Sequence, residues 1–148
     1  MNKDFRIRPG TVDEAVDVSK QIPELVDPYL EEEYERRFIH TPHIILVAEL
    51  EGGEIIGFKA GYEREKDGSF YSWMGGVRPE WRKEGLATAL AHGMEAWARA
   101  QGYKALRFKT RNYLRNMLHF AISDGFNVIG FEAADSIEQH RIWFEKKL

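Results

Sequence analysis

A short basic stretch near the middle of the chain, residues 82–87, has the composition of a phosphate-binding turn. The apolar, aromatic residues 70–77 before it predict a strand, and an amphipathic pattern after it predicts a helix. The first amides of a helix have no partner within the helix, and the helix dipole favours an anion there. Gly85 removes the side chain where a ligand would approach, and Arg82 and Lys83 add positive charge. The stretch therefore predicts an anion site at the start of a long helix.

The full pattern is more specific than its parts: a strand, Val77-x-Pro79, an aromatic residue, Arg82-x-x-Gly85-x-Ala87, and a helix. It resembles motif A of the GNAT-type N-acetyltransferase family, whose turn binds the pyrophosphate of acetyl-CoA. The resemblance implies that the whole turn contacts the cofactor, through Arg82, Lys83, Glu84, Gly85, Leu86 and Ala87. The competing interpretation is an ordinary strand–turn–helix with basic residues present by chance.

The same resemblance places pantetheine beside the end of the preceding strand. In the family this strand has a bulge and separates from the next parallel strand, and pantetheine pairs with its backbone as an added strand would. The expected backbone contacts are Met74, Gly75, Gly76 and Val77. Glycine inside a strand often marks a bulge or a close approach, so we expect the bulge at Gly75-Gly76. A flexible strand end is the alternative.

A second family feature is an Asn at the start of the following helix. Asn112 is the candidate for a hydrogen bond to pantetheine, with Asn116 in reserve because helix boundaries shift by a residue or more. Helix capping explains Asn112 equally well. The family's usual general acid is a Tyr, and Ala121 stands at that position here. Tyr113 and His119 are near in sequence, but the sequence does not fix their direction.

Tyr71 stands where some relatives carry a Glu as general base, which makes it the candidate catalytic residue. A Tyr with a pKa near 10 is a poor base at neutral pH, so Tyr71 would line the acceptor pocket or relay a proton. A packed aromatic side chain is the favoured alternative. The acceptor site in this fold usually lies beside the first two helices, where residues 31–35 carry four Glu. An acidic rim there would attract a cationic amine, but a solvated helix face is the favoured interpretation. Trp73 is expected in the core.

The apolar pattern also predicts the elements that position these groups. Thr11, with Glu14 three residues later, predicts a capped first helix. Further helices are expected at about residues 28–38, 83–101 and 112–124, and strands at about 5–8, 44–50, 55–62, 70–77, 105–110, 126–131 and 140–144. The order resembles the α/β (α+β) GNAT-like three-layer fold. That fold is a mixed central sheet of about seven strands with a β-bulge splay, flanked by about four helices.

Composition limits the alternatives. The 148 residues are expected to form a single domain, 1–148. The net charge of −3 gives no basic footprint for nucleic acid, and the absence of Cys excludes disulfides and thiolate metal sites. The His residues have no metal-ligand spacing, so no metal is expected. No segment has membrane-spanning length, so we expect no membrane partner and a cytoplasmic protein. The oligomeric state stays open, a homodimer included.

These features, with the resemblance, predict an acyl-CoA-dependent N-acetyltransferase. It would move an acetyl group from acetyl-CoA, its co-substrate, to a primary amine of a small molecule or peptide by direct attack. One alternative is a catalytically silent acyl-CoA-binding module, which the missing Tyr favours. Another is a transferase for a longer acyl group, because the sequence does not reveal the acyl preference.

Overall fold

The computed structural model describes residues 4–148. Residues 1–3, which the expected domain 1–148 includes, lie outside the described residues. The elements are β1 (Phe5–Pro9), α1 (Val12–Ser19), α2 (Glu31–Phe38), β2 (His43–Leu50), β3 (Ile55–Tyr62), β4 (Ser69–Val77), η1 (Pro79–Trp81), α3 (Leu86–Ala100), β5 (Ala105–Arg111), α4 (Arg115–Ser123), β6 (Asn127–Glu132), η2 (Ile137–Gln139) and β7 (Arg141–Lys147). No helix in this part of the chain has the length and apolarity needed to cross a membrane.

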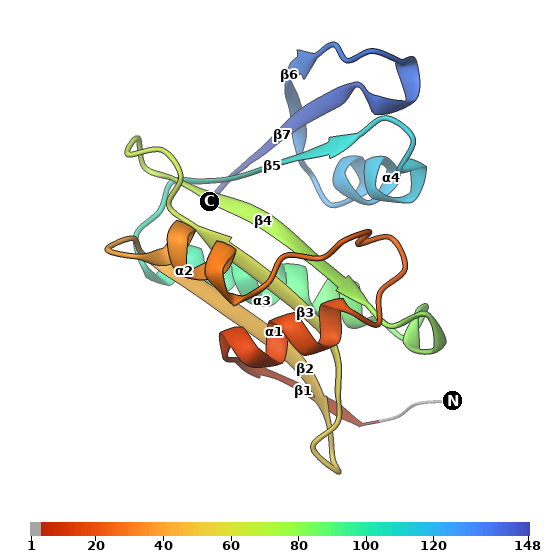
Figure 1. The fold of residues 1–148 in the computed structure, drawn as a ribbon. Helices are drawn as coiled ribbons and strands as arrows, with labels where there is room; N and C mark the ends of the chain where they lie inside the picture. Colours follow the sequence, from red (N-terminus) through yellow and green to blue (C-terminus); the bar gives the residue numbers. More distant parts are fainter. Residues whose placement is uncertain (1–3) are drawn as a thin grey trace.

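Within residues 4–148, a seven-stranded sheet separates two layers of helices (Figure 1). The strand order is β1-β2-β3-β4-β5-β7-β6, and β4 and β5 pair in parallel while the other neighbours pair antiparallel. The core on one face contains residues of α1 and α2, and the core on the other contains residues of α3 and α4. This arrangement confirms the predicted three-layer fold with a mixed sheet.

β2 contributes to both cores. Ile45 and Val47 pack on the side of α1 and α2, whereas Leu46 and Ala48 pack on the side of α3. Successive side chains of a strand point to opposite faces, so a strand covered on both faces must be apolar at every position. The continuous apolar run of β2 is therefore explained, and its interpretation as a doubly covered strand is confirmed.

The start of α1 is tied to the sheet by a capping box and an arginine. The Thr11 hydroxyl accepts a hydrogen bond from the Glu14 amide at 3.2 Å, and the Glu14 carboxylate accepts one from the Thr11 amide at 3.0 Å. Arg8 on β1 donates to Glu14 at 2.6 Å and to Glu49 on β2 at 2.7 Å. The hydrogen bond from Arg8 is the largest cause that lowers the pKa of Glu14. The predicted capping box is confirmed, and it fixes where α1 enters the fold.

Three helices begin later than predicted. α3 begins at Leu86 and not near residue 83, because Lys83 and Gly85 have φ angles of 66° and 85°, outside the right-handed helical region. α4 begins at Arg115 with Leu114 as its N-cap, so Asn112 does not cap it and the capping interpretation was wrong. α2 begins at Glu31 and not near residue 28. The delayed starts leave the segments that precede these helices free to form turns at the site.

β4 and β5 pair only where they begin. Ser69, Phe70 and Tyr71 pair with residues of β5, and no later residue of β4 does. Beyond Tyr71 the two strands diverge, as Figure 1 shows. The predicted splay is confirmed, and it leaves one backbone edge of β4 unpaired on the β5 side.

The bulge in β4 lies at Trp73. Ser72 pairs with Gly61 and Met74 pairs with Ala60, so Trp73 is an extra residue without an opposite partner on β3. The predicted position at Gly75-Gly76 was wrong, because both glycines pair in regular register with β3. The bulge turns β4 where the splay from β5 begins, because a bulged strand bends locally.

Candidate active site

An apolar pocket of about 300 Å³ fills the space between the diverged strands. Its walls include Met74, Gly75, Gly76 and Val77 from β4, Ala87, Leu90 and Ala91 from α3, Phe108 from β5, and Asn116, Met117 and Phe120 from α4. The structure therefore brings together all four predicted pantetheine contacts on β4 and one residue of the predicted turn. A strand edge with free backbone groups beside apolar walls suits an extended chain that carries amides, because such a chain can pair as an added strand.

The glycines of β4 are required by close packing. A Cβ on Gly75 would lie 2.7 Å from the carbonyl oxygen of Phe58, and one on Gly76 would lie 3.0 Å from a methyl group of Ile22. Both distances are tighter than ordinary contacts between carbon and its neighbours. Glycine is needed at these two positions because β3 and the segment after α1 approach them closely, and not because the strand bulges there.

The turn before α3 presents amides and a left-handed glycine. Gly85 has φ 85° and open space where a Cβ would stand, and it is the N-cap of α3 without a side-chain hydrogen bond. Leu86 is buried in the core, so only its backbone can face a ligand. The amides of the first turn of α3 therefore meet the physical requirements of an anion site.

Arg82 is held by partners within the protein. Its guanidinium donates to Glu24 at 2.8 and 2.5 Å and to the carbonyl oxygen of Val77 at 3.1 Å. The hydrogen bond from Arg82 is the largest cause that lowers the pKa of Glu24. A pyrophosphate at the turn would compete with Glu24 for this arginine.

Asn112 and Asn116 lie in different surroundings. Asn112 lies in the turn before α4, where its amide nitrogen donates to the carbonyl oxygen of Ile137 at 3.3 Å and its backbone N–H donates to His140 at 2.7 Å. Asn116 lines the apolar pocket, and Asn112 does not. The contact of Asn112 with pantetheine stays a prediction, while the geometry favours the reserve residue.

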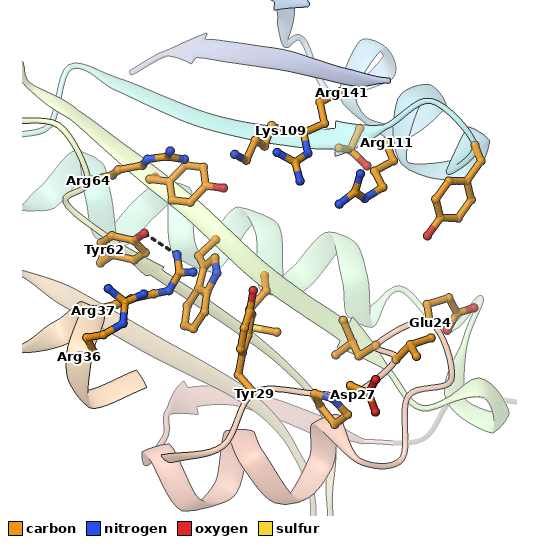
Figure 2. A pocket seen from close by; sticks show the side chains of 18 residues that line it. Glu24, Asp27, Tyr29, Arg36, Arg37, Tyr62, Arg64, Lys109, Arg111 and Arg141 are labelled. Atoms are coloured by element: carbon orange, nitrogen blue, oxygen red, sulfur yellow. Dashed lines mark hydrogen bonds between the residues drawn. The ribbon is translucent and has the colours of Figure 1, made fainter. Parts of the chain in front are cut away.

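A larger, polar pocket of about 920 Å³ lies on the side of α1 and α2 (Figure 2). It is bounded by the α1–α2 connection, α2, the end of β3, β4, the end of β5 and the start of β7. Trp73, Met74 and Lys109 line both this pocket and the apolar pocket. The two cavities therefore meet at the splay between β4 and β5.

Tyr71 is buried in the wall of the polar pocket. Its ring lies 5.0 Å from the Arg64 guanidinium and 5.9 Å from the Trp143 ring. Burial is the main cause that raises the pKa of Tyr71, which keeps its hydroxyl protonated at neutral pH. Tyr71 therefore combines the two interpretations that its position suggested: a packed aromatic side chain that lines a pocket. Its catalytic role stays a prediction.

Ala121 and its neighbours do not supply a replacement acid at the apolar pocket. Ala121 is buried in the core on the α3 side. Tyr113 lines the polar pocket, and His119 is exposed and lines neither cavity. Of these residues, only Tyr113 reaches a cavity where an acceptor could bind.

The rim that α2 presents to the polar pocket is basic. Arg36 and Arg37 line the pocket, whereas Glu31, Glu32 and Glu35 are exposed and do not. The acidic-rim interpretation was wrong and the solvated helix face is confirmed, because the helical period turns these three carboxylates away from the pocket.

Sequence reasoning missed a cation–aromatic cluster in the same wall. The Arg37 guanidinium lies 4.4 Å from the centre of the Trp73 ring and donates to the Tyr62 hydroxyl at 2.8 Å. Trp73 was expected in the core, but the bulge places it between the two pockets. The sequence signal for Arg37 was limited to its spacing from Glu33, four residues earlier.

Lys59 was also missed. It stands on β3 opposite Gly75 and lines the apolar pocket. Burial lowers its pKa to about 8. A lysine in an apolar run such as β3 could have been noticed in the sequence, but only the structure shows that its side chain turns towards the α3 side.

Comparisons with known proteins agree with this geometry. The model of the acetyltransferase (GNAT) family matches residues 13–126. An acetyltransferase of Yersinia enterocolitica is 30% identical over 119 residues, which cover 80% of this chain and 74% of the relative. The ribosomal-protein-S18-alanine N-acetyltransferase of Escherichia coli has a similar structure, with a TM-score of 0.81, 13% identity and coverage of 97% and 94%. A GNAT family acetyltransferase from Elizabethkingia anophelis with acetyl-CoA bound has a TM-score of 0.75, 18% identity and coverage of 97% and 98%.

The two solved structures bear on the fold alone, since both are well below 25% identical to this chain. The matched family region extends from α1 to the residue before β6, and so contains the strand splay, the turn before α3 and most of both pocket walls. The chain therefore belongs to the GNAT acetyltransferase family, whose members use acetyl-CoA as the acetyl donor.

Proposed function

We propose that this protein moves an acetyl group from acetyl-CoA to a primary amine of a small molecule or peptide by direct attack. The observation that carries the proposal is the junction of the two cavities at Trp73, Met74 and Lys109. One cavity is apolar and suits pantetheine, and the other is polar, open and large enough for an acceptor. Reactants held on either side of such a junction can meet without a further intermediate. Residues 1–148 would act as a single domain, since one continuous sheet carries both pockets.

The backbone of β4 would hold the donor. Beyond Tyr71 the β5-facing edge of β4 does not pair with β5, so the backbone groups that Met74 to Gly76 present on that edge are available to pantetheine. The Val77 carbonyl oxygen already accepts a hydrogen bond from Arg82. The turn of residues 82–87 would bind the pyrophosphate through the first amides of α3. Amides near Gly75 and Gly76 would polarise the thioester carbonyl, because fixed donors stabilise the charge that develops on the oxygen.

Water takes part in both proton transfers of the reaction. The free amine nitrogen forms a bond to the acetyl carbon, the carbon–sulfur bond breaks, and the departing CoA thiolate takes a proton from water. The amine loses its own proton to water or to a carboxylate of the polar pocket. Glu24 and Asp27 line that pocket, but Arg82 holds Glu24 and lowers its pKa, which weakens Glu24 as a base. Water and Asp27 remain as acceptors of the proton.

A catalytically silent acyl-CoA-binding module is the second candidate. The observation that favours it is the buried Ala121 at the position of the family's usual Tyr acid. A CoA thiol with a pKa near 8.5 can leave without that acid, so its absence does not prevent transfer.

Release of free CoA thiol in the presence of a panel of primary amines separates the two candidates. The proposed transferase releases thiol in proportion to amine concentration, and mass spectrometry finds the acetylated amine. The silent module binds acetyl-CoA in calorimetry but releases thiol no faster with amines than without them. That second result would overturn the proposed function and leave the cofactor site intact.

A further inference from the structure

The polar pocket has a concentration of positive charge that the whole chain does not share. Its cationic lining residues are Arg36, Arg37, Arg64, Lys109, Arg111 and Arg141. Its acidic lining residues among those described are Glu24 and Asp27. The chain as a whole has a net charge of −3. The excess of cations is therefore local to this cavity, where it sets the potential that an entering molecule meets.

The two arginines of α2 share a single carboxylate, that of Glu33, which offsets only one of their two charges. Glu33 lies 2.5 Å from Arg36 and 2.7 Å from Arg37. Glu24 does not offset the remaining cations, because it is bound to Arg82. The opposite wall, which β5 and β7 build, holds the largest group of pocket cations without a close carboxylate.

Three residues form that wall, and we name them the β5–β7 cation cluster: Lys109, Arg111 and Arg141. Lys109 and Arg111 are two residues apart on β5, so their side chains leave the strand on the same face. Arg111 and Arg141 are paired across the β5–β7 ladder. Figure 2 shows the three side chains gathered at one wall of the pocket, opposite Tyr29 and Asp27.

The cluster is only partly compensated by carboxylates. Among residues 4–148, no carboxylate lies within 4 Å of the charged groups of Lys109 or Arg111. Lys109 rests over the Trp143 ring at 5.1 Å, and Arg111 donates to the Gln139 carbonyl oxygen at 3.3 Å. Arg141 reaches Glu132 only at 4.0 Å. Glu132 also interacts electrostatically with Lys109, but one carboxylate can offset at most one of the three charges, so the cluster keeps a net positive charge.

The cations of the cluster repel one another and Arg64, which is unfavourable. Burial is the largest cause that lowers the pKa of Lys109; the charge of Glu132 opposes this fall, and the charges of Arg64 and Arg141 add to it. A bound anion would reverse the last two effects and would accept hydrogen bonds from the arginines, which suit carboxylate and phosphate groups. The same field would repel an amine that carries a second positive charge.

We propose that the acetyl acceptor is a small amine that also carries a carboxylate or phosphate group, with its anion bound by the β5–β7 cation cluster. The inference rests on the proposed acetyl transfer. Lys109 lines both cavities, so an anion on the cluster lies beside the junction and leaves the amine close to the thioester. The pocket volume of about 920 Å³ falls within the range of small-molecule sites.

Matched pairs of amines test the charge requirement. L-Glutamate is compared with L-glutaminamide, and phosphoethanolamine with ethanolamine, with cadaverine as a dication. We expect kcat/KM for the anionic member of at least one pair to exceed that of its neutral partner by about tenfold or more. The pair that shows the larger ratio identifies carboxylate or phosphate as the anion, and cadaverine is expected to be the poorest acceptor.

Variants of the cluster test its location. Arg111→Gln and Arg141→Gln each remove one cluster charge, and Lys147→Gln removes a charge at the exposed far end of β7, outside the polar pocket. The ratio between anionic and neutral acceptors should fall by about tenfold in the cluster variants and stay constant in Lys147→Gln. Binding of citrate to the CoA-saturated protein, measured by calorimetry, should weaken in the same two variants. Melting temperatures establish that all three variants fold.

Three results would overturn the inference. Equal or better transfer to the neutral or dicationic amines, with CoA binding intact, would reject an anionic acceptor while leaving acetyl transfer in place. A loss of CoA affinity in Arg111→Gln or Arg141→Gln would assign the cluster to the phosphates of the cofactor. Binding of acetyl-CoA without transfer to any amine would reject the proposed function itself, and this inference with it.

Discussion

Replacement of Lys59 by Met is expected to stabilise the protein at neutral pH. Lys59 lies in the wall of the apolar pocket, and no hydrogen bond or ion pair from its ammonium group is found among residues 4–148. Burial lowers its pKa from 10.5 to about 8, so its charged form is less stable in the folded protein than in the unfolded chain. Met has a similar length and no charge, so it removes this cost without leaving a large cavity.

The size of the gain follows from the pKa. A fall in the pKa of Lys59 from 10.5 to about 8 means that protonated Lys59 destabilises the folded protein by about 3.4 kcal/mol. The side chain of Lys59 is half-buried and keeps part of its surface accessible from the pocket, which reduces that cost. We therefore expect Lys59→Met to raise the free energy of unfolding by about 1–2 kcal/mol at pH 7.

The stability gained by Lys59→Met should decrease as the pH rises. Below about pH 8, Lys59 is protonated in both states and the folded state bears the full cost. Between about 8 and 10.5 the unfolded chain binds the proton that the folded protein has lost, so the stability of the unmodified protein rises with pH. The advantage of Lys59→Met should therefore shrink through this interval and disappear above it.

Urea unfolding at about pH 7 and about pH 10 measures both effects. Lys147→Met serves as the control, because Lys147 is exposed and its replacement removes the same charge from the surface. A destabilised Lys59→Met at neutral pH, or a gain of equal size at both pH values, would show that burial does not disfavour the charge of Lys59.

Four further predictions test other parts of the structure. Gly85→Glu places a carboxylate at the start of α3 and should weaken CoA binding in calorimetry by about tenfold or more, and unchanged affinity would move the pyrophosphate site elsewhere. Tyr71→Phe should lower kcat by less than about tenfold, or about 1.4 kcal/mol, whereas a loss of about a thousandfold at constant CoA affinity would make the hydroxyl catalytic. Asn116→Ala should raise the KM for acetyl-CoA more than Asn112→Ala does, and the reverse order would restore Asn112 as the pantetheine contact. Thr11→Ala should lower the free energy of unfolding by about 1 kcal/mol in urea titrations, and no loss would mean that the capping box is not formed in solution.

Much of the fold could be predicted because its signals are local. The capping box of Thr11 and Glu14, the apolar run of β2 and the alternation of β5 each depend on residues within one element. The order of elements then limits the topology, because a strand, a helix and a second strand in succession favour a parallel pair. Boundaries were less accurate where left-handed residues such as Lys83 delay a helix.

The proposed acetyl-CoA site could also be predicted from the sequence. A turn that binds phosphate uses backbone amides, a glycine and the start of a helix, and all of these come from consecutive residues. The predicted contacts on β4, Met74 to Val77, lie shortly before this turn and belong to the same continuous segment. The sequence could predict this half of the site because the proposed contacts belong to one continuous segment.

The residues that line the proposed acceptor pocket could be identified only from the tertiary structure. Lys109, Arg111 and Arg141 are far from Arg37 in the sequence, and only the packing of β5 and β7 beside the open side of β4 turns them towards one cavity. The bulge at Trp73 likewise depends on the register with β3, which the strand pattern alone does not define. The sequence by itself determined the family and the fold, and it predicted the donor segment, through local propensities and contiguous backbone groups. The charge and shape of the acceptor pocket were decided only by the tertiary structure, because they arise from side chains that the fold brings together from distant segments.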